Sequence, residues 1–249
     1  MIIVQGLSYQ VGDQKILRRV NLRVEKGCTV AVMGMSGVGK STLLKCIAGL
    51  VEPVSGQVLI DGANIVGIEE RDRSKIRRRM GMVFQYGALF DSLSVYENVS
   101  FGLRRHTNWS EQEIAAVVNE TLSMVGLPRT GDLMPSELSG GMQKRVGLAR
   151  AIAMEPDVVL YDEPTAGLDP ITSATIAELI VKTRDQLGVT SVVVSHDIPT
   201  IKRVSNSIAM LHAGRIVASG SVEEMENCED KAVRQFMDGS IDGPIEITR

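Results

Sequence analysis

One glycine-rich segment constrains this chain more than any other part of the sequence. It reads Gly34-Met35-Ser36-Gly37-Val38-Gly39-Lys40-Ser41-Thr42 and fits the phosphate-binding loop pattern G-x-x-x-x-G-K-[ST]. Residues 29–33 before it predict a buried strand, and an apolar stripe that begins at Leu43 predicts a helix after it. A strand, a glycine turn and a helix in this order aim backbone N–H groups and the positive end of the helix dipole at one point. We therefore expect the segment to bind a polyphosphate.

Two side chains of this loop have roles that follow from that geometry. Lys40 is expected to reach the β- and γ-phosphates as a point charge, and the Ser41 hydroxyl to bind a Mg²⁺ ion that bridges them. The alternative is a glycine turn that matches the pattern by accident. The remaining motifs have to decide between the two interpretations.

The length and composition favour one large α/β domain or two small ones. The chain has 249 residues, 44% of them hydrophobic and only 4% aromatic, which suits an aliphatic core. Its net charge of −3 gives no strongly basic face, so we expect no nucleic-acid partner.

Cysteine usage and the absence of long apolar runs bear on the compartment. Cys28, Cys46 and Cys228 are scattered and odd in number, which indicates neither a disulfide framework nor a zinc site, and we expect a reducing, cytoplasmic setting. The first residues lack the layout of a signal peptide, and no apolar run is long enough to cross a bilayer. If the protein acts at a membrane, another subunit has to span it.

The apolar patterns predict an α/β core with an antiparallel β-layer and an inserted helical subdomain. Strand-like segments near the N-terminus, at 2–4, 20–24 and 56–62, predict the β-layer. We assign 1–86 and 159–222 to the core and 87–158 to the helical subdomain, where a helical stripe runs from Ile114 to Val125.

Three further segments carry local expectations. Residues 69–79 are highly charged, and because acidic residues interrupt the basic ones we favour a solvated helical face over a nucleic-acid patch. Asp169 can cap a helix with Pro170 at its first position, and Gly188 can end that helix. Residues 223–249 read as a polar helix and an extended, loop-rich tail that we do not expect to belong to the core, and that we expect to contact another subunit or partner.

A pair of carboxylates follows a second buried strand. Val158 to Tyr161 lead directly into Asp162 and Glu163, and a buried parallel strand would deliver both to the carboxyl edge of the sheet, where α/β folds bind ligands. Asp162 is suited to hold Mg²⁺ through its water shell, and Glu163 to polarise the attacking water as general base. A strand that ends in two surface acids is the alternative.

A second anion-receptive helix start lies at Ser139-Gly140-Gly141. Folding both phosphate-seeking segments of one chain onto one nucleotide is hard to arrange from opposite subdomains. Two copies arranged head-to-tail would let each complete the other's site.

Together these motifs resemble the nucleotide-binding subunit of ABC transporters. Their order and spacing match across about residues 1–222, including Gln85, Ala166-Gly167-Leu168-Asp169 and His196. The resemblance implies a P-loop NTPase fold with a RecA-like core, ATP and Mg²⁺ as cofactors, and a homodimer.

The resemblance also implies individual roles. It implies that Gln85 contacts the Mg²⁺ and relays its state to a membrane partner, and that His196 holds the γ-phosphate and the attacking water. It implies that Ser139 to Gly141 bind the γ-phosphate of the facing subunit's ATP and that Asp169 lies at the subunit contact. Read alone, Gln85 would be a strand-end polar residue and His196 a surface histidine.

Two positions depart from the family pattern. Met142 stands where many members have Gln, outside the phosphate-contacting residues, so we expect activity to survive. The aromatic residue that stacks on adenine is harder to place: the usual position before a glycine is Val11, whereas Tyr9 offers the larger π surface. A core or subunit-facing role for Tyr9 is the alternative.

A narrower resemblance, to the ATPase subunit of Mla-type lipid-asymmetry systems, covers four segments. These are 85–90, 133–138, 169–172 and the tail segment 233–244. It implies an integral-membrane permease of the MlaE type, a periplasmic lipid-binding subunit, often a small cytoplasmic regulatory subunit, and a tail that reaches across the dimer. The protein would then be peripheral, at the cytoplasmic face of the inner membrane.

The sequence therefore predicts an ATPase motor that powers phospholipid transport between inner and outer membranes through a separate permease. A soluble ABC-type ATPase acting on ribosomes or DNA is the rival, but such proteins usually carry two ATPase modules, a long coiled coil or zinc cysteines. An ABC ATPase for a different cargo is the third possibility.

Overall fold

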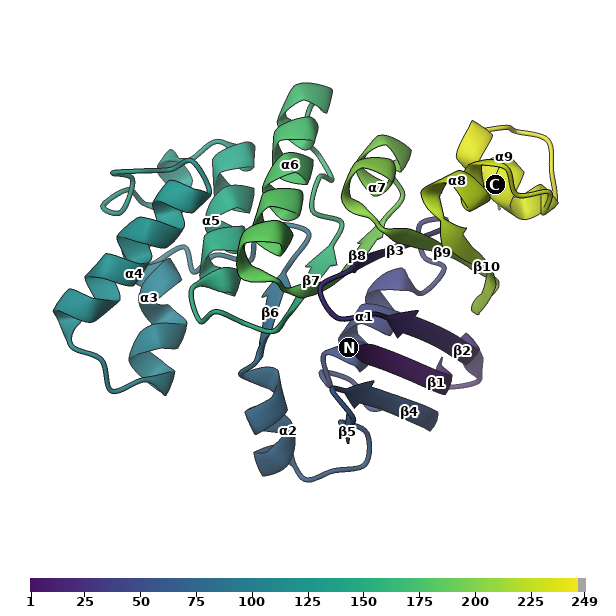
Figure 1. The fold of residues 1–249 in the computed structure, drawn as a ribbon, viewed down its shortest axis with the longest axis horizontal. Coiled ribbons are helices and arrows are strands. Elements are labelled where there is room, and N and C mark those ends of the chain that lie inside the picture. Colours follow the sequence, from purple (N-terminus) through teal and green to yellow (C-terminus); the bar gives the residue numbers. More distant parts are fainter. Residues whose placement is uncertain (246–249) are drawn as a thin grey trace.

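The strands of the protein form two sheets that lie beside one another (Figure 1). The computed structural model describes residues 1–245. The antiparallel sheet has the order β2-β1-β4-β5 and consists of β1 (Ile2–Val11), β2 (Gln14–Val24), β4 (Ser55–Ile60) and β5 (Ala63–Asn64). The second sheet has the order β10-β9-β3-β8-β7-β6 and consists of β3 (Thr29–Met33), β6 (Met80–Val83), β7 (Val158–Asp162), β8 (Thr190–Ser195), β9 (Ser207–His212) and β10 (Arg215–Ser221).

The second sheet is parallel except for β10, which pairs antiparallel with β9. Met33 at the end of β3 pairs with Ser195 at the end of β8, and Val194 of β8 pairs with Asp162 at the end of β7. Three strands therefore end side by side, and the residues that follow them share one edge of the sheet.

Alternation along the strands divides the apolar core between the two faces of this sheet. Val158 and Leu160 of β7 belong to the cluster that also holds the antiparallel sheet and α1, whereas Val159 and Tyr161 belong to the cluster on the other face. The buried strand that the sequence predicted at 158–161 is confirmed, and it is covered on both sides.

Helices surround the parallel sheet and fill a long insertion between β6 and β7. They are α1 (Lys40–Ile47), α2 (Glu70–Arg77), α3 (Val95–His106), α4 (Glu111–Met124), α5 (Gly140–Ile152), α6 (Pro170–Leu187), α7 (Ile198–Val204), α8 (Val222–Glu226) and α9 (Lys231–Asp238), with a short 3₁₀ turn at Pro135–Glu137. Helices α3 to α5 lie at one end of the molecule and α8 and α9 at the other (Figure 1). An α/β core with an antiparallel β-layer and inserted helices is thus confirmed.

Local signals set several helix ends as expected. Asp169 caps α6 by accepting the N–H groups of Ile171 and Thr172, each at 3.0 Å, and Gly188 ends the helix in the left-handed region with φ 64°. The charged stretch 69–79 contains α2, which has no buried residue, so it is a solvated helix. None of the described helices combines the length and the apolar character needed to span a bilayer.

The tail differs from the expectation. Ile245 is buried in a cluster with Met33 and Val233, and the Gln235 side chain fixes it by accepting its N–H at 2.7 Å and donating to its carbonyl oxygen at 3.2 Å. The expectation that the tail stays outside the core is therefore wrong for Ile245, because α9 and the tail cover a face of β3 and β9. Residues 246–249 of the predicted tail lie outside the described residues.

The Tyr161 ring is fully buried, yet its hydroxyl has no hydrogen-bond partner among residues 1–245, and burial raises its pKa. Because an unpaired buried hydroxyl costs free energy, Tyr161→Phe should raise the free energy of unfolding by about 1 kcal/mol. Urea denaturation measures it. The exposed Tyr86→Phe should change it by less than about 0.5 kcal/mol, and a clear loss of stability in Tyr161→Phe would contradict the assignment.

Candidate functional site

The glycine-rich loop joins β3 to α1 at the edge of the parallel sheet. Gly39 is the N-cap residue of α1 with φ 109°, a conformation that side chains disfavour. A Cβ atom on Gly34 would overlap the carbonyl oxygen of Leu211, so this position has room only for glycine. The two glycines thus allow the chain to turn sharply from β3 into the start of α1, and a helix N-terminus suits an anion.

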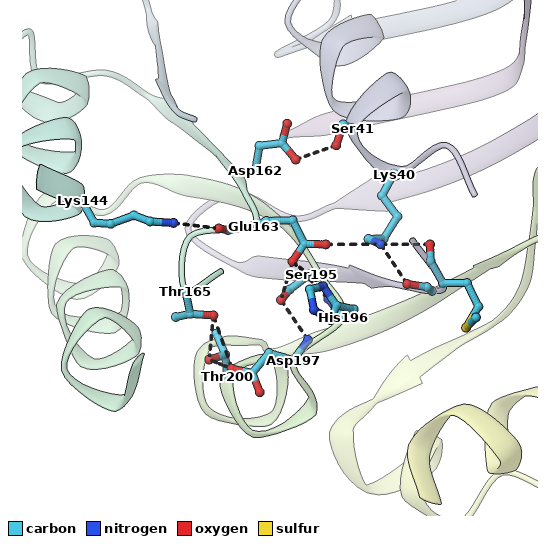
Figure 2. A network of polar contacts seen from close by, with 12 residues as sticks. Lys40, Ser41, Lys144, Asp162, Glu163, Thr165, Ser195, His196, Asp197 and Thr200 are labelled. Carbon is cyan, nitrogen blue, oxygen red and sulfur yellow. Dashed lines mark hydrogen bonds and ion pairs between the residues drawn. The ribbon is translucent and has the colours of Figure 1, made fainter. Parts of the chain in front are cut away.

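The Lys40 side chain is buried beneath the loop. Its amine donates to the carbonyl oxygens of Gly34 at 2.8 Å and Met35 at 3.1 Å, and lies 3.3 Å from Glu163 Oε1 (Figure 2). A phosphate oxygen would offer this amine a stronger, charged acceptor than the two carbonyls. The geometry therefore suits a phosphate held over the loop.

Two oxygen-bearing side chains meet beside Lys40. The Ser41 hydroxyl donates to Asp162 Oδ1 at 2.7 Å, which joins the first turn of α1 to the end of β7. Hydroxyl and carboxylate oxygens are the ligands that Mg²⁺ takes in nucleotide sites. The donor set thus fits a magnesium ion.

Glu163 is the centre of a polar network just beyond β7 (Figure 2). Its Oε2 atom accepts from the Ser195 hydroxyl at 3.2 Å and the His196 N–H at 3.3 Å, and lies 2.9 Å from His196 Nδ1. Glu163 is buried, while the His196 side chain is 52% exposed. The Glu163 carboxylate is therefore held by hydrogen bonds from the end of β8, while the His196 imidazole is in contact with solvent.

A cavity opens beside Glu163 and His196, between α6 and α7, with a volume of about 620 Å³. Its lining includes Thr165 and Thr200, whose hydroxyls both donate to the Asp197 carboxylate, the first at 3.3 Å. Sequence reasoning missed Ser195 and these three residues. Their place in the sequence could have indicated two of them, because Ser195 and Asp197 flank His196 directly at the end of a buried strand.

The second glycine pair lies elsewhere. Ser139 is the N-cap of α5 and accepts the Met142 N–H at 3.3 Å, and both Ser139 and Gly140 are exposed. In residues 1–245, no hydrogen bond or ion pair joins Ser139–Gly141 to the phosphate loop at 34–42. One chain therefore brings Lys40, Ser41, Asp162, Glu163 and His196 together, but not this segment.

Asp169 is also exposed. The Thr172 hydroxyl and N–H, together with the Ile171 N–H, donate to its carboxylate, and these bonds lower the pKa of Asp169. The carboxylate thus caps α6 and faces solvent.

Three candidate residues remain, Gln85, Tyr9 and Val11. Gln85 is half-buried in the turn after β6. Tyr9 packs partly against the core beneath the antiparallel sheet and lines a cavity of about 400 Å³, whereas Val11 is 61% exposed at the end of β1. Adenine stacking remains a prediction for both.

Comparison with known proteins identifies the class. A family model described as "ABC transporter" matches residues 17–166, which is more than half of the chain. The chain therefore belongs to the ABC transporter family, and it is an ATP-binding and ATP-hydrolysing subunit. Individual relatives and solved structures show which members of this family the chain is similar to.

Similar curated proteins cover nearly the whole chain. The "Intermembrane phospholipid transport system ATP-binding protein MlaF" of Haemophilus influenzae is 42% identical over 99% of this chain and 94% of its own. The protein of the same name in Escherichia coli K12 is 42% identical over 98% and 91%. A "Probable ribonucleotide transport ATP-binding protein mkl" of Mycobacterium leprae is 39% identical over 99% and 71%.

Solved structures agree on the fold. A dimeric, post-hydrolysis structure of the ATP-binding cassette MJ0796 with ADP and phosphate superimposes with a TM-score of 0.82 at 35% identity, covering 89% of this chain and 99% of that one. The cbiO1 protein of Clostridium perfringens, part of the transporter complex cbiONQ, gives a TM-score of 0.84 at 32% identity, covering 96% and 95%.

The buried Lys40 amine predicts a large effect on nucleotide affinity. If Lys40 donates charge-assisted hydrogen bonds to phosphate, Lys40→Ala would remove them, and the Kd for ATP should rise at least about tenfold. Isothermal titration calorimetry measures it. The matched control is Lys45→Ala, an exposed residue of the same helix, which should leave the Kd unchanged. Equal affinity in wild type and Lys40→Ala would overturn the loop assignment.

Proposed function

We propose that this chain is the ATPase motor of a transporter that moves phospholipid between inner and outer membranes. The observation that carries the motor assignment is the Glu163 carboxylate, which contacts Lys40 with one oxygen and His196 with the other, next in sequence to the hydrogen-bonded pair of Ser41 and Asp162. The cargo rests on the relatives named MlaF, which match nearly the whole chain.

In this proposal the chain's own residues position and neutralise charge. The loop 34–42 holds the phosphates, and Lys40 compensates the charge that develops on the transferred group. Ser41, Asp162 and Gln85 would hold Mg²⁺, which when bound would neutralise negative charge on the phosphate oxygens. Glu163 orients the attacking water and accepts its proton, and His196 holds the γ-phosphate and the water in place.

We further propose that two copies complete each other's sites. Ser139, Gly140 and Gly141 would bind the γ-phosphate held by the facing copy, with Asp169 at the contact between the copies. The exposure of Ser139 and Gly140 in one chain supports this arrangement. The cassette MJ0796, similar in fold and sequence, has been solved as a dimer.

The proposed assembly also includes a membrane partner. We propose an integral-membrane permease of the MlaE type, with a periplasmic lipid-binding subunit and a small cytoplasmic regulatory subunit, and a peripheral location on the cytoplasmic face of the inner membrane. Gln85 would relay the state of the nucleotide site to the permease as the helical subdomain, residues 87–158, moves. Residues 223–249 would contact a subunit or partner.

A second cargo is favoured by one specific observation. The relative named as a ribonucleotide transporter is 39% identical, close to the 42% of the phospholipid transporters. The ATPase subunit itself need not touch cargo, so ribonucleotide remains the rival cargo.

The composite site makes a prediction about mixed dimers. Lys40→Ala spoils one half-site, and Ser139→Asp should spoil the other, because it keeps a good N-cap residue but sets a carboxylate against the phosphate. Each variant alone should lose most of its ATPase activity. A mixture restores one intact site in each mixed dimer, so it should recover about a quarter of the wild-type rate when copies pair at random.

The control for that experiment uses two defects on the same half-site. A mixture of Lys40→Ala with Glu163→Gln leaves no intact site in any dimer and should recover nothing. If both mixtures recover equally, or if neither does, the composite site is wrong.

The cargo prediction is tested on the assembled transporter. The chain should co-purify with an integral-membrane protein from detergent-solubilised membranes, and the complex in vesicles should move labelled phospholipid when ATP is added. ATP-driven uptake of ribonucleotide without phospholipid movement would favour the rival cargo. Recovery of ribosomes or DNA in place of a membrane protein would contradict transport altogether.

A further inference from the structure

One buried charge near the site has no role in the proposed hydrolysis. Lys144 lies on α5, and only 6% of its surface is exposed. Its amine donates to the main-chain carbonyl oxygen of Glu163 at 3.3 Å, which is its one hydrogen bond to the described residues. Figure 2 shows the extended side chain reaching from the helix toward the loop after β7.

A lysine is an unfavourable residue to bury, because its charged amine loses water. Burial lowers the pKa of Lys144, and the negative charge of Glu163 acts in the opposite direction. Methionine would fill a similar space without this cost. The free-energy cost of burying Lys144 is offset only if its charge or its hydrogen bond stabilises a neighbouring group. The group that its amine contacts is Glu163.

The backbone that Lys144 contacts is in a strained conformation. Glu163 has φ 46°, in the left-handed region that non-glycine residues disfavour. Hydrogen bonds hold it there: its N–H donates to Val194 at 2.9 Å, and its carbonyl oxygen accepts from Ala166 at 3.2 Å as well as from Lys144. The direction of the Glu163 carboxylate depends on this backbone conformation.

The contact also bridges two parts of the molecule. Lys144 belongs to the helices inserted between β6 and β7, whereas Glu163 follows β7 of the core sheet. A shift of α5 against the sheet would carry the amine away from the Glu163 carbonyl. The hydrogen bond therefore makes the conformation of the loop at Glu163 depend on the position of α5 relative to the sheet.

We propose that Lys144 is a positioning residue that holds the strained Glu163 backbone in its hydrolytic conformation. ATP hydrolysis would then depend on the position of α5 relative to the core sheet. The inference rests on the proposed role of Glu163. Lys144 touches neither the nucleotide nor the water in this scheme. It acts through Glu163 alone.

The test compares steady-state ATP hydrolysis by Lys144→Met, Lys144→Arg and wild type. Lys144→Met should lower kcat about tenfold and leave the KM for ATP within about twofold, because nucleotide binding is untouched. Lys144→Arg keeps the charge and the donor and should retain at least about a third of kcat. The matched control is Lys182→Met, an exposed lysine of α6, which should behave as wild type.

A double-mutant cycle separates positioning from a general structural defect. If Lys144 acts through Glu163, Lys144→Met should have little further effect on the residual hydrolysis of Glu163→Gln. An unchanged kcat in Lys144→Met, or an equal loss in the wild-type and Glu163→Gln backgrounds, would overturn the inference. Should Glu163→Gln itself hydrolyse ATP at the wild-type rate, it is the proposed function that fails.

Discussion

The hydrogen-bonded register of the parallel sheet is the constraint on which the site depends. Because β3, β7 and β8 run in the same direction and end side by side, the phosphate loop, the Asp162-Glu163 pair and His196 reach one edge from positions more than 150 residues apart in the chain. No single segment could hold these groups together. Apolar clusters cover the strands on both faces of the sheet.

Electrostatics then concentrates on one carboxylate. Glu163 faces the Lys40 amine with one oxygen and the Ser195–His196 segment with the other, so its two oxygens serve the loop and the strand end separately. In the proposed function, a nucleotide phosphate would compete with Glu163 for the Lys40 amine and so weaken the Lys40–Glu163 ion pair. If Glu163 is the general base, as proposed, ligand binding would be coupled to the contacts of that base through Lys40.

Much of this arrangement follows from the sequence, since local patterns carry it. The strand before the phosphate loop, the Asp169 cap and the Gly188 stop depend on neighbouring residues, and the structure has them where the patterns placed them. The Lys144 contact and the burial of Ile245 depend on packing between segments that are distant in sequence. The one local hint for Lys144 is that Gly147 and Leu148, three and four residues later on the same helix, are buried, so that Lys144 falls on a buried face.

The burial of Ile245 has a practical consequence for handling this protein. Its side chain shields apolar sheet surface behind the strand that leads into the phosphate loop. A shortened version that stops before this residue would expose that apolar surface to solvent. Ile245 also lines a pocket together with Met35, Ser36 and His196, so the damage would begin beside the phosphate loop. Truncated variants should therefore retain Ile245, so that they report on the role of the tail and not on aggregation.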